Sequence, residues 1–474
     1  MTRRAIKKDL SDRRAAAIVA VTTSFALPFS GAALTVAVPI IGIEFNSSAT
    51  SLGWIVSAFF ISATVFAIPF GKIGDIWGRR RIMFMGLFIF AAFSAAIIFS
   101  NSLEMLIVFR ILQGLGGGMI NATNIAILIE VFPEQMRGRA LGMSVSATYL
   151  GISAGPVIGG LVTHHLGWRA VAVLFTVILI FAFVVAVWRL PKTAGIVREE
   201  ELDKTVNLIS ILLYMVSIAV LMYGFTTFGQ NVWSYILFVV GIILLVVFII
   251  REDKVSNPIV EIRLWKTNIN YLLSNCAALL NYSATYAVGY LISIYLQMVK
   301  GYSADITGII LITQALTQSI CSPFAGRLSD KKSPYMIATI GMALCVVSLF
   351  TFTFISENTS IVFVIVSLVI IGVGTAFFAS PNTNAIMSCV EPSDYGMASS
   401  IVSTMRHLGQ LSSMAIITII FHFSIGNTPI ADATKSSLSS SMKIIFVVFV
   451  LLCLIGMFIS TQRKTTNRRL NENN

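Results

Sequence analysis

The sequence has little charge for its length. Only 11% of its 474 residues are Asp, Glu, Lys or Arg, whereas 56% are hydrophobic and the mean hydropathy is +0.87. Soluble domains carry about 25% charged residues, so this composition excludes an ordinary soluble protein. Apolar runs recur along the chain, and many reach the roughly 20 residues that a membrane-spanning helix needs. The composition therefore predicts an all-α polytopic membrane protein.

Groups that carry enzyme chemistry are also scarce. The five cysteines lie in or beside apolar runs without metal-ligand spacing, which indicates packing residues rather than disulfides or metal ligands. We find no cluster of metal-ligating residues, no nucleophile–base set and no phosphate-binding loop. The longest links, 191–204 and 251–267, are too short to hold a soluble domain. We therefore expect no enzyme activity, no cofactor and no metal.

Fourteen apolar segments follow one another, joined by short polar links. The first is preceded by a hydrophilic, basic stretch and is too long for the core of a signal peptide, so we expect it to remain as a span. An even number of spans places both termini on the same side of the membrane. The segments are 15–42, 50–72, 81–101, 103–131, 138–163, 168–190, 205–228, 232–250, 268–299, 304–328, 334–356, 358–389, 394–424 and 440–461.

The positive charges fix the orientation of these spans. If the N-terminus lies inside, 27 of the 33 Lys and Arg fall in inside segments. This distribution follows the positive-inside rule. The net charge of +12 then reflects topology and contact with anionic lipid, and we expect no nucleic-acid partner. We predict a protein of the cell membrane with both termini in the cytoplasm.

The two ends of the chain resemble each other. Residues 69–75 read PFGKIGD and residues 323–330 read PFAGRLSD, with Asp75 and Asp330 at the corresponding ends. A second set of matches has a constant offset of 258 residues: Gly114, Gly116 and Asn124 with Gly372, Gly374 and Asn382. The repeat predicts a six-span bundle in residues 1–190 and another in 268–474, with two inserted spans in 191–267. A substrate path then lies between the bundles, near the middle of the bilayer.

The link after the second span carries a specific motif. Small residues there allow close approach of backbones, and a carboxylate at such a place can pair with an arginine or a helix N-terminus. An ordinary positive-inside loop is one explanation of this link, although the order Gly-Asp-Gly-Arg is more specific than such a loop requires. Asp330 is the corresponding residue in the second half. The residues of the motif are Gly71, Asp75, Gly78, Arg79 and Arg80.

The fourth span carries a polar stripe at helical spacing. Arg110, Gln113, Asn121 and Asn124 share this stripe. An arginine within the hydrocarbon is costly, by about 2.5–3.5 kcal/mol or more, and needs a polar partner or a water-filled cavity. Arg110 is therefore either a contact between helices or a cation that lines a cavity.

The fifth span carries closely spaced glycines and a proline. Glycines four residues apart make a flat helix face, and the proline bends the helix. From the residues alone, this pattern indicates close packing between helices. The residues are Gly151, Gly155, Pro156, Gly159 and Gly160.

Together these motifs resemble the major facilitator superfamily, and within it the fourteen-span drug–proton antiporters. The resemblance covers most of the chain, with specific motifs in the first half and degraded copies in the second. It implies a monomer that exports small amphipathic molecules by alternating access, coupled to protons. It also implies that the loop after the second span is the cytoplasmic gate and that the glycine motif marks an exporter.

The chain departs from that family where an acidic residue is usual. Ser30 and Ala32 stand at the positions of the family's acid and threonine in the first span, and no Asp or Glu lies in the middle of any span. The ionisable groups left in mid-span are Arg110, Arg406 and His407. A cavity with these groups suits neutral or anionic substrates. His407 and Glu130 are the candidate proton sites, although each is also explained as a structural group.

Other polar residues within spans are candidates to line the path: Asn281, Tyr282, Tyr286, Gln314, Gln318, Asn382 and Gln410. The first functional hypothesis is a multidrug exporter. The second is a transporter of a single metabolite, with an anion as one option, without the usual carboxylate for proton coupling. A membrane enzyme or a sensor lacks support in the residues, and the internal repeat disfavours a channel.

Overall fold

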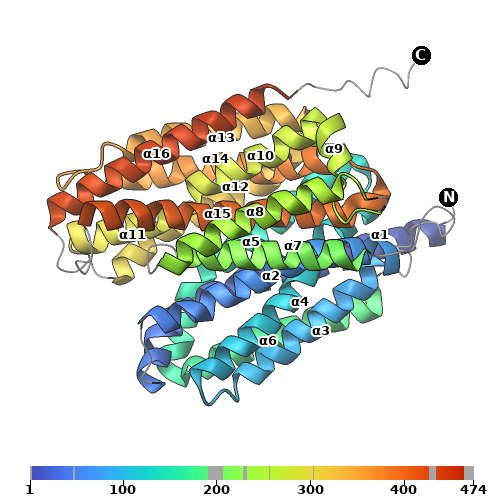
Figure 1. Ribbon diagram of the computed structural model, residues 1–474, viewed down its shortest axis with the longest axis horizontal. Coiled ribbons are helices and arrows are strands. Elements are labelled where there is room, and N and C mark those ends of the chain that lie inside the picture. Colours follow the sequence, from blue (N-terminus) through green and yellow to red (C-terminus); the bar gives the residue numbers. More distant parts are fainter. Residues whose placement is uncertain are drawn as a thin grey trace.

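The computed structural model describes residues 3–45, 49–190, 207–227, 232–255, 257–302, 304–425 and 434–463. Every regular element in these ranges is a helix (Figure 1). Thirteen of the described helices are long and apolar enough to cross a membrane, and α15 adds a further helix of 31 residues. Each of the fourteen predicted segments falls on one of these long helices or, for 268–299, on a broken one. The prediction of an all-α polytopic protein is confirmed.

The first six helices pack against one another. Helix α1 contacts α5 and α6, α2 contacts α4, and α3 contacts α4 and α6. Gly78 (φ 102°) and Gly167 (φ 81°) make the sharp turns after α2 and α5, in a backbone region that favours glycine. The helices are α1 (Arg3–Glu44), α2 (Ala49–Trp77), α3 (Arg79–Ile97), α4 (Leu103–Val131), α5 (Glu134–Leu166) and α6 (Trp168–Arg189).

The last helices form a second bundle, in which α10 contacts α14, α15 and α16, and α12 and α13 contact α14. The predicted single span 268–299 is broken into three pieces. At the first break the Ala287 N–H donates to Ser413 Oγ of α15 (3.1 Å), which satisfies a donor that the helix leaves free. The elements are α10 (Ile269–Thr285), α11 (Val288–Ile294), η1 (Tyr295–Val299), α12 (Ala304–Lys331), α13 (Pro334–Phe352), α14 (Ile361–Met387), η2 (Pro392–Asp394), α15 (Tyr395–Ile425) and α16 (Lys435–Thr461).

The packing within the two bundles repeats at the matched glycines. A methyl group at Gly114 would meet the Phe59 carbonyl of α2 at 2.6 Å, and one at Gly372 would meet the Gln314 carbonyl of α12 at 2.7 Å. Helix α4 thus lies against α2 as α14 lies against α12. The same small residues permit the same close helix contact in both halves.

The inserted pair α7 (Leu208–Thr226) and α8 (Val232–Glu252) contacts both bundles. The Tyr214 hydroxyl of α7 donates to the Thr64 carbonyl of α2 (3.2 Å). After α8, the chain reaches the second bundle, where the Glu261 N–H contacts Met397 Sδ of α15 (3.4 Å). The short helix α9 (Ile262–Thr267) follows and leads into α10.

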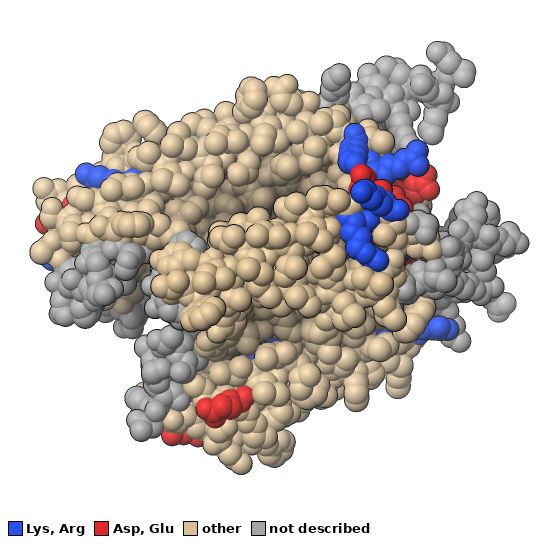
Figure 2. All heavy atoms as spheres, in the orientation of Figure 1, with Lys and Arg blue, Asp and Glu red and all other residues tan. Residues whose placement is uncertain are grey.

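Helix α1 begins and α16 ends at the same end of the molecule, to the right in Figure 1. We call this the inner end and the opposite one the outer end. Lys and Arg gather at the inner end on the face shown in Figure 2, and the body between the ends is almost free of charge. The charge bias predicts that the inner end faces the cytoplasm.

Candidate transport site

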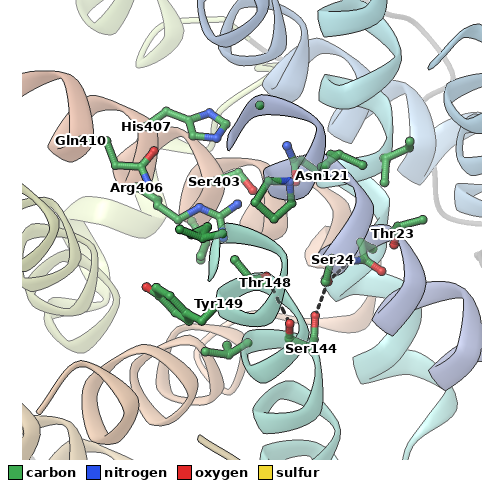
Figure 3. Close-up of a pocket in the computed structure, with 18 of the residues that line it drawn as sticks. Thr23, Ser24, Asn121, Ser144, Thr148, Tyr149, Ser403, Arg406, His407 and Gln410 are labelled. Atoms are coloured by element: carbon green, nitrogen blue, oxygen red, sulfur yellow. Dashed lines mark hydrogen bonds between the residues drawn. The ribbon is translucent and has the colours of Figure 1, made fainter. Parts of the chain in front are cut away.

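A central cavity of 210 Å³ lies between the two bundles. Its walls come from α1, α2, α4 and α5 on one side and from α10, α14 and α15 on the other. Figure 3 shows polar side chains from several of these helices directed into it. Nine predicted candidates line this cavity or the one described next: Asn121, Asn124, Tyr282, Tyr286, Gln314, Gln318, Arg406, His407 and Gln410.

A larger cavity of 920 Å³ extends from the central one toward the outer end. The two cavities share Tyr149, Ile152, Tyr282, Tyr286 and Gln410. Helices α5, α11 and α12 contribute wall residues from their outer halves. Drug-sized ligands occupy pockets of roughly 300–1,000 Å³, so the outer cavity has room for one. The path is therefore open from the centre toward the outer end.

Arg406 provides a positive charge at the central cavity. It extends from α15 into the space near Ser403 and Tyr149 (Figure 3). Among the described residues that line either cavity, none is Asp or Glu. The site can therefore attract negative charge and offers no carboxylate to a cation.

His407, the next residue, turns toward α2. Its Nδ1 lies 3.1 Å from Thr64 Oγ1, and its ring packs edge-on against Phe60 with centroids 5.8 Å apart. The side chain is buried at the contact between the two bundles. A change in its protonation would act on this contact as well as on the cavity.

The sequence analysis missed several hydroxyl groups of the central cavity. Ser24 Oγ lies 2.6 Å from Ser144 Oγ and accepts a hydrogen bond from Asn124 Nδ2 (2.9 Å). Thr148 and Tyr149 continue the same face of α5. Ser144 and Thr148 are four residues apart on a glycine-rich span, and this spacing could have predicted a polar face of the fifth span.

The residues of the predicted gate join the two bundles at the inner end. The Asp75 carboxylate, at the end of α2, accepts hydrogen bonds from the N–H groups of Gly396 and Met397, each at 3.0 Å. These donors lie in the first turn of α15, where free N–H groups and the helix dipole favour a negative charge. Gly71 approaches Gly396 closely in the same contact.

The second half supplies a matching contact. The Asp330 carboxylate, at the end of α12, accepts hydrogen bonds from the N–H groups of Gly138 (2.6 Å) and Arg139 (3.0 Å) near the start of α5. Gly138 and Gly326 lie against each other here, with no room for a methyl group at either position. The bundles are thus joined at the inner end by two equivalent contacts.

Arg79 supports the Asp75 contact. It donates to Asp75 (2.8 Å), Glu130 (3.1 Å) and the Pro392 carbonyl (2.5 Å), and its guanidinium lies 5.6 Å from the centre of the Tyr395 ring. Glu130, a candidate proton site, is therefore a partner of the gate arginine. Arg80 turns away to the Val187 carbonyl of α6 (3.2 Å).

Acidic residues crowd the inner end next to this gate. Burial, and then the nearby carboxylates of Glu261 and Asp75, raise the pKa of Asp394 to about 6. Lys72 opposes this shift. Asp394 directly precedes α15, so its charge lies close to the Asp75 contact.

Arg110 and Gln113 lie outside both cavities. Arg110 is fully buried within the first bundle, donates to the Ile55 carbonyl (2.7 Å) and to Gln113, and lies 4.5 Å from the centre of the Phe59 ring. Gln113 Nε2 continues the chain to Ser94 Oγ (2.7 Å). In this conformation the two residues join α2, α3 and α4 and do not face the path.

Two candidates from the second bundle also lie outside both cavities. Asn382 Oδ1 accepts from Arg463 (2.6 Å), and its Nδ2 donates to the Ser274 carbonyl (3.1 Å). Asn382 therefore binds the end of α16 to α10. Asn281 is buried within the second bundle.

The glycine motif of the fifth span forms the contact between α5 and α1. Methyl groups at Gly155 and Gly159 would meet Ala32 Cβ at 2.5 Å and Ala33 Cα at 2.7 Å. Gly151 lies equally close to the Phe25 carbonyl, and Gly160 is half-buried. The side chain of Pro156 lies outside the described part of the chain. The motif thus brings α5 and α1 together along the wall of the central cavity.

Comparison with known proteins agrees with this architecture. Residues 20–251 and 275–473 match the family model described as the Major Facilitator Superfamily. The chain is 28% identical over 447 residues to the riboflavin transporter RibZ of Clostridioides difficile. This alignment covers 93% of this chain and 96% of RibZ. The chain is also 28% identical over 391 residues to the multidrug resistance protein Stp of Mycobacterium tuberculosis, covering 81% and 71% of the two chains.

A solved structure has the same fold. The human organic anion transporter MFSD10 superposes with a TM-score of 0.69, covering 95% of this chain and 99% of that one. The sequences are 14% identical, so this likeness concerns the fold alone.

Proposed function

Because the chain belongs to the Major Facilitator Superfamily, we propose that it is a secondary active exporter of small amphipathic molecules that works by alternating access. As a member of this family it is a multi-pass membrane transporter and not an enzyme. The finer assignment, to the fourteen-span drug–proton antiporters, is supported by the glycine motif of α5 and by the similarity to Stp.

One observation carries the alternating-access proposal. The Asp75 and Asp330 contacts close the inner end, while the cavities extend toward the outer end. This arrangement corresponds to one of the two states that alternating access requires. The moving units in our proposal are residues 1–190 and 268–474, with 191–267 as the insert. We propose that the protein works as a monomer in the cell membrane, with both termini in the cytoplasm.

The transport proposal is tested with inside-out membrane vesicles. A panel of fluorescent amphipathic dyes is presented outside the vesicles, and uptake is followed with and without an imposed pH gradient. We expect gradient-dependent uptake that is absent from vesicles without the protein. Equal uptake by both kinds of vesicle across the whole panel would rule out drug export.

The coupling ion is examined with the two candidate proton sites. Glu130→Gln and His407→Gln each remove a titratable group, and Glu134→Gln, at an exposed position, is the matched control. We expect one of the first two variants to lose the response to the pH gradient while the control keeps it. A wild-type protein that transports without any response to the gradient would point to facilitated diffusion or to another ion.

The second candidate is a dedicated transporter of one metabolite, with an anion as one option. It is favoured by the lack of carboxylates among the described cavity residues and by the similarity to RibZ. Competition separates the two candidates. A dedicated transporter is inhibited by few compounds of closely related structure, whereas a multidrug exporter is inhibited by many unrelated ones.

A further inference from the structure

We propose that Arg406 binds the negatively charged group of an amphipathic aromatic substrate, and that the cavities form a site for organic anions. The inference rests on the proposed transport function and specifies the substrate class. It starts from a difference between Arg406 and the other arginines in the interior.

Arg406 has no hydrogen bond and no ion pair with any described residue. Three arginines that are more deeply buried each have partners within the chain: Arg79 binds two carboxylates, Arg110 a carbonyl and Gln113, and Arg463 Asn382. A cation in the membrane interior is costly unless it is paired or hydrated. Arg406 is half-buried and lines the cavity, so its guanidinium is accessible to water or to a ligand that enters from outside the chain.

The surrounding groups suit an anion that also has an apolar body. The hydroxyl of Ser403 is buried, lines the central cavity and has no hydrogen-bond partner among the described residues, and the Gln318 amide lies beside Tyr149 in the wall of the outer cavity. Both groups can donate hydrogen bonds to a carboxylate or a sulfonate. The described lining residues contain no Asp or Glu that would compete for Arg406.

Aromatic side chains surround the charge. Phe59, Phe60, Tyr149, Tyr282 and Tyr286 line the central cavity. Aromatic faces and edges bind flat rings, while a planar guanidinium binds a carboxylate through two parallel hydrogen bonds. A flat aromatic anion therefore satisfies both parts of the site, with its ring among the aromatic residues and its charged group at Arg406.

Binding to the purified protein tests this assignment without requiring transport. Three probes share one ring system and differ in charge: 2-naphthoate, 2-naphthylmethanol and 2-naphthylmethylammonium. Their affinities are measured by calorimetry in nanodiscs of zwitterionic lipid. The variants are Arg406→Gln, Arg406→Lys and, as a control that removes one exposed positive charge elsewhere, Lys443→Gln.

We expect Arg406→Gln to weaken the binding of 2-naphthoate by about 10- to 100-fold, the usual effect of losing hydrogen bonds to a charged group. Arg406→Lys retains the charge without the paired donors and should fall between this variant and the wild type. Lys443→Gln should bind as the wild type does. The neutral alcohol should bind equally to all four proteins.

Four results would overturn the proposal: no binding of 2-naphthoate to the wild type, unchanged binding to Arg406→Gln, an equal loss for the neutral alcohol, or an equal loss in Lys443→Gln. Transport in proteoliposomes keeps this inference separate from the proposed function. Loss of anion binding in Arg406→Gln without transport of any probe by the wild type supports the anion site and counts against the exporter. Transport of 2-naphthoate that is the same in the wild type and in Arg406→Gln would support the transport function and count against the anion site at Arg406.

Discussion

Asp75 and Asp330, 255 residues apart in the sequence, make the same contact in opposite directions across the inner end. Each carboxylate ends a helix of its own bundle and accepts two N–H groups near the start of a helix of the other bundle. Asp75 also forms an ion pair with Arg79 (2.8 Å), which ties its charge to Glu130 through the same arginine.

Neutralising either carboxylate should open the inner end. Asp75→Asn weakens an ion pair and two contacts with N–H groups, and Asp330→Asn weakens two contacts with N–H groups, each worth about 1.5–3 kcal/mol, so both variants should populate the open state. The measurement is the distance between spin labels at Trp77 and Lys332 in a cysteine-free background. Asp253→Asn, at an exposed carboxylate, is the control. A distance that neither Asp75→Asn nor Asp330→Asn changes would contradict the role we give to these contacts.

A methyl group at Gly138 should prevent closure. In Gly138→Ala the added carbon would meet the Gly326 carbonyl and Asp330 Oδ1, and helix backbones cannot yield as a flexible side chain can. We expect the spin labels at Trp77 and Lys332 to show only the longer distance of the open inner end. Gly308→Ala adds the same group to α12 where no atom lies within 4 Å, and should leave the distance unchanged.

Replacing the two mid-span arginines should affect stability differently. Arg110→Gln removes a buried charge that donates to Ile55 and Gln113, and should reduce the free energy of unfolding by about 1.5–3 kcal/mol. Arg406→Gln removes a charge without a described partner and should leave the unfolding temperature unchanged or raise it. Thermal unfolding of both variants in the same detergent compares them. An equal loss of stability in the two variants would indicate that Arg406 is a packing contact.

Stability should decrease as the pH rises through about 6. The folded protein raises the pKa of Asp394 to about 6, above the value of about 3.9 for an exposed carboxyl, so the folded state binds this proton more tightly than the unfolded state. The resulting stabilisation is complete below about pH 4 and is lost as the pH rises through about 6. It amounts to at most about 3 kcal/mol, because each unit of pKa corresponds to about 1.4 kcal/mol.

The comparison is made between the wild type and Asp394→Asn, unfolded thermally from pH 5 to pH 7.5. The variant should lack the part of the pH dependence that this carboxyl contributes and should be the more stable protein at pH 7.5. Asp253→Asn again serves as the control. A variant whose pH dependence equals that of the wild type would show that Asp394 does not titrate in this range.

The sequence predicted the elements that depend on local pattern. The length of the apolar runs located the spans. The short motifs around Asp75 and Asp330 are similar in sequence, which placed the two residues in equivalent positions of the repeat. The break in 268–299 was not predicted, because its satisfied donor depends on Ser413, more than a hundred residues away.

Site residues were harder to predict, because the face that a helix turns toward the path is set by its neighbours. Arg110 and Arg406 look alike in the sequence, yet one lies among α2, α3 and α4 and the other in the cavity wall. Tyr149 and Thr148 carry no charge and were overlooked, although they lie in the centre of the site. From the sequence alone, a polar residue in a span can lie either inside a helix bundle or in the cavity wall, and only the packing of the helices decides between the two.

The added helices have a mechanical consequence. Tyr214 attaches α7 to α2, and Glu261 attaches the segment after α8 to the start of α15. In the alternating-access cycle that we propose, any rotation that separates α2 from α15 must stretch or break these two contacts. We therefore expect the inserted pair to restrain the relative rotation of the two bundles.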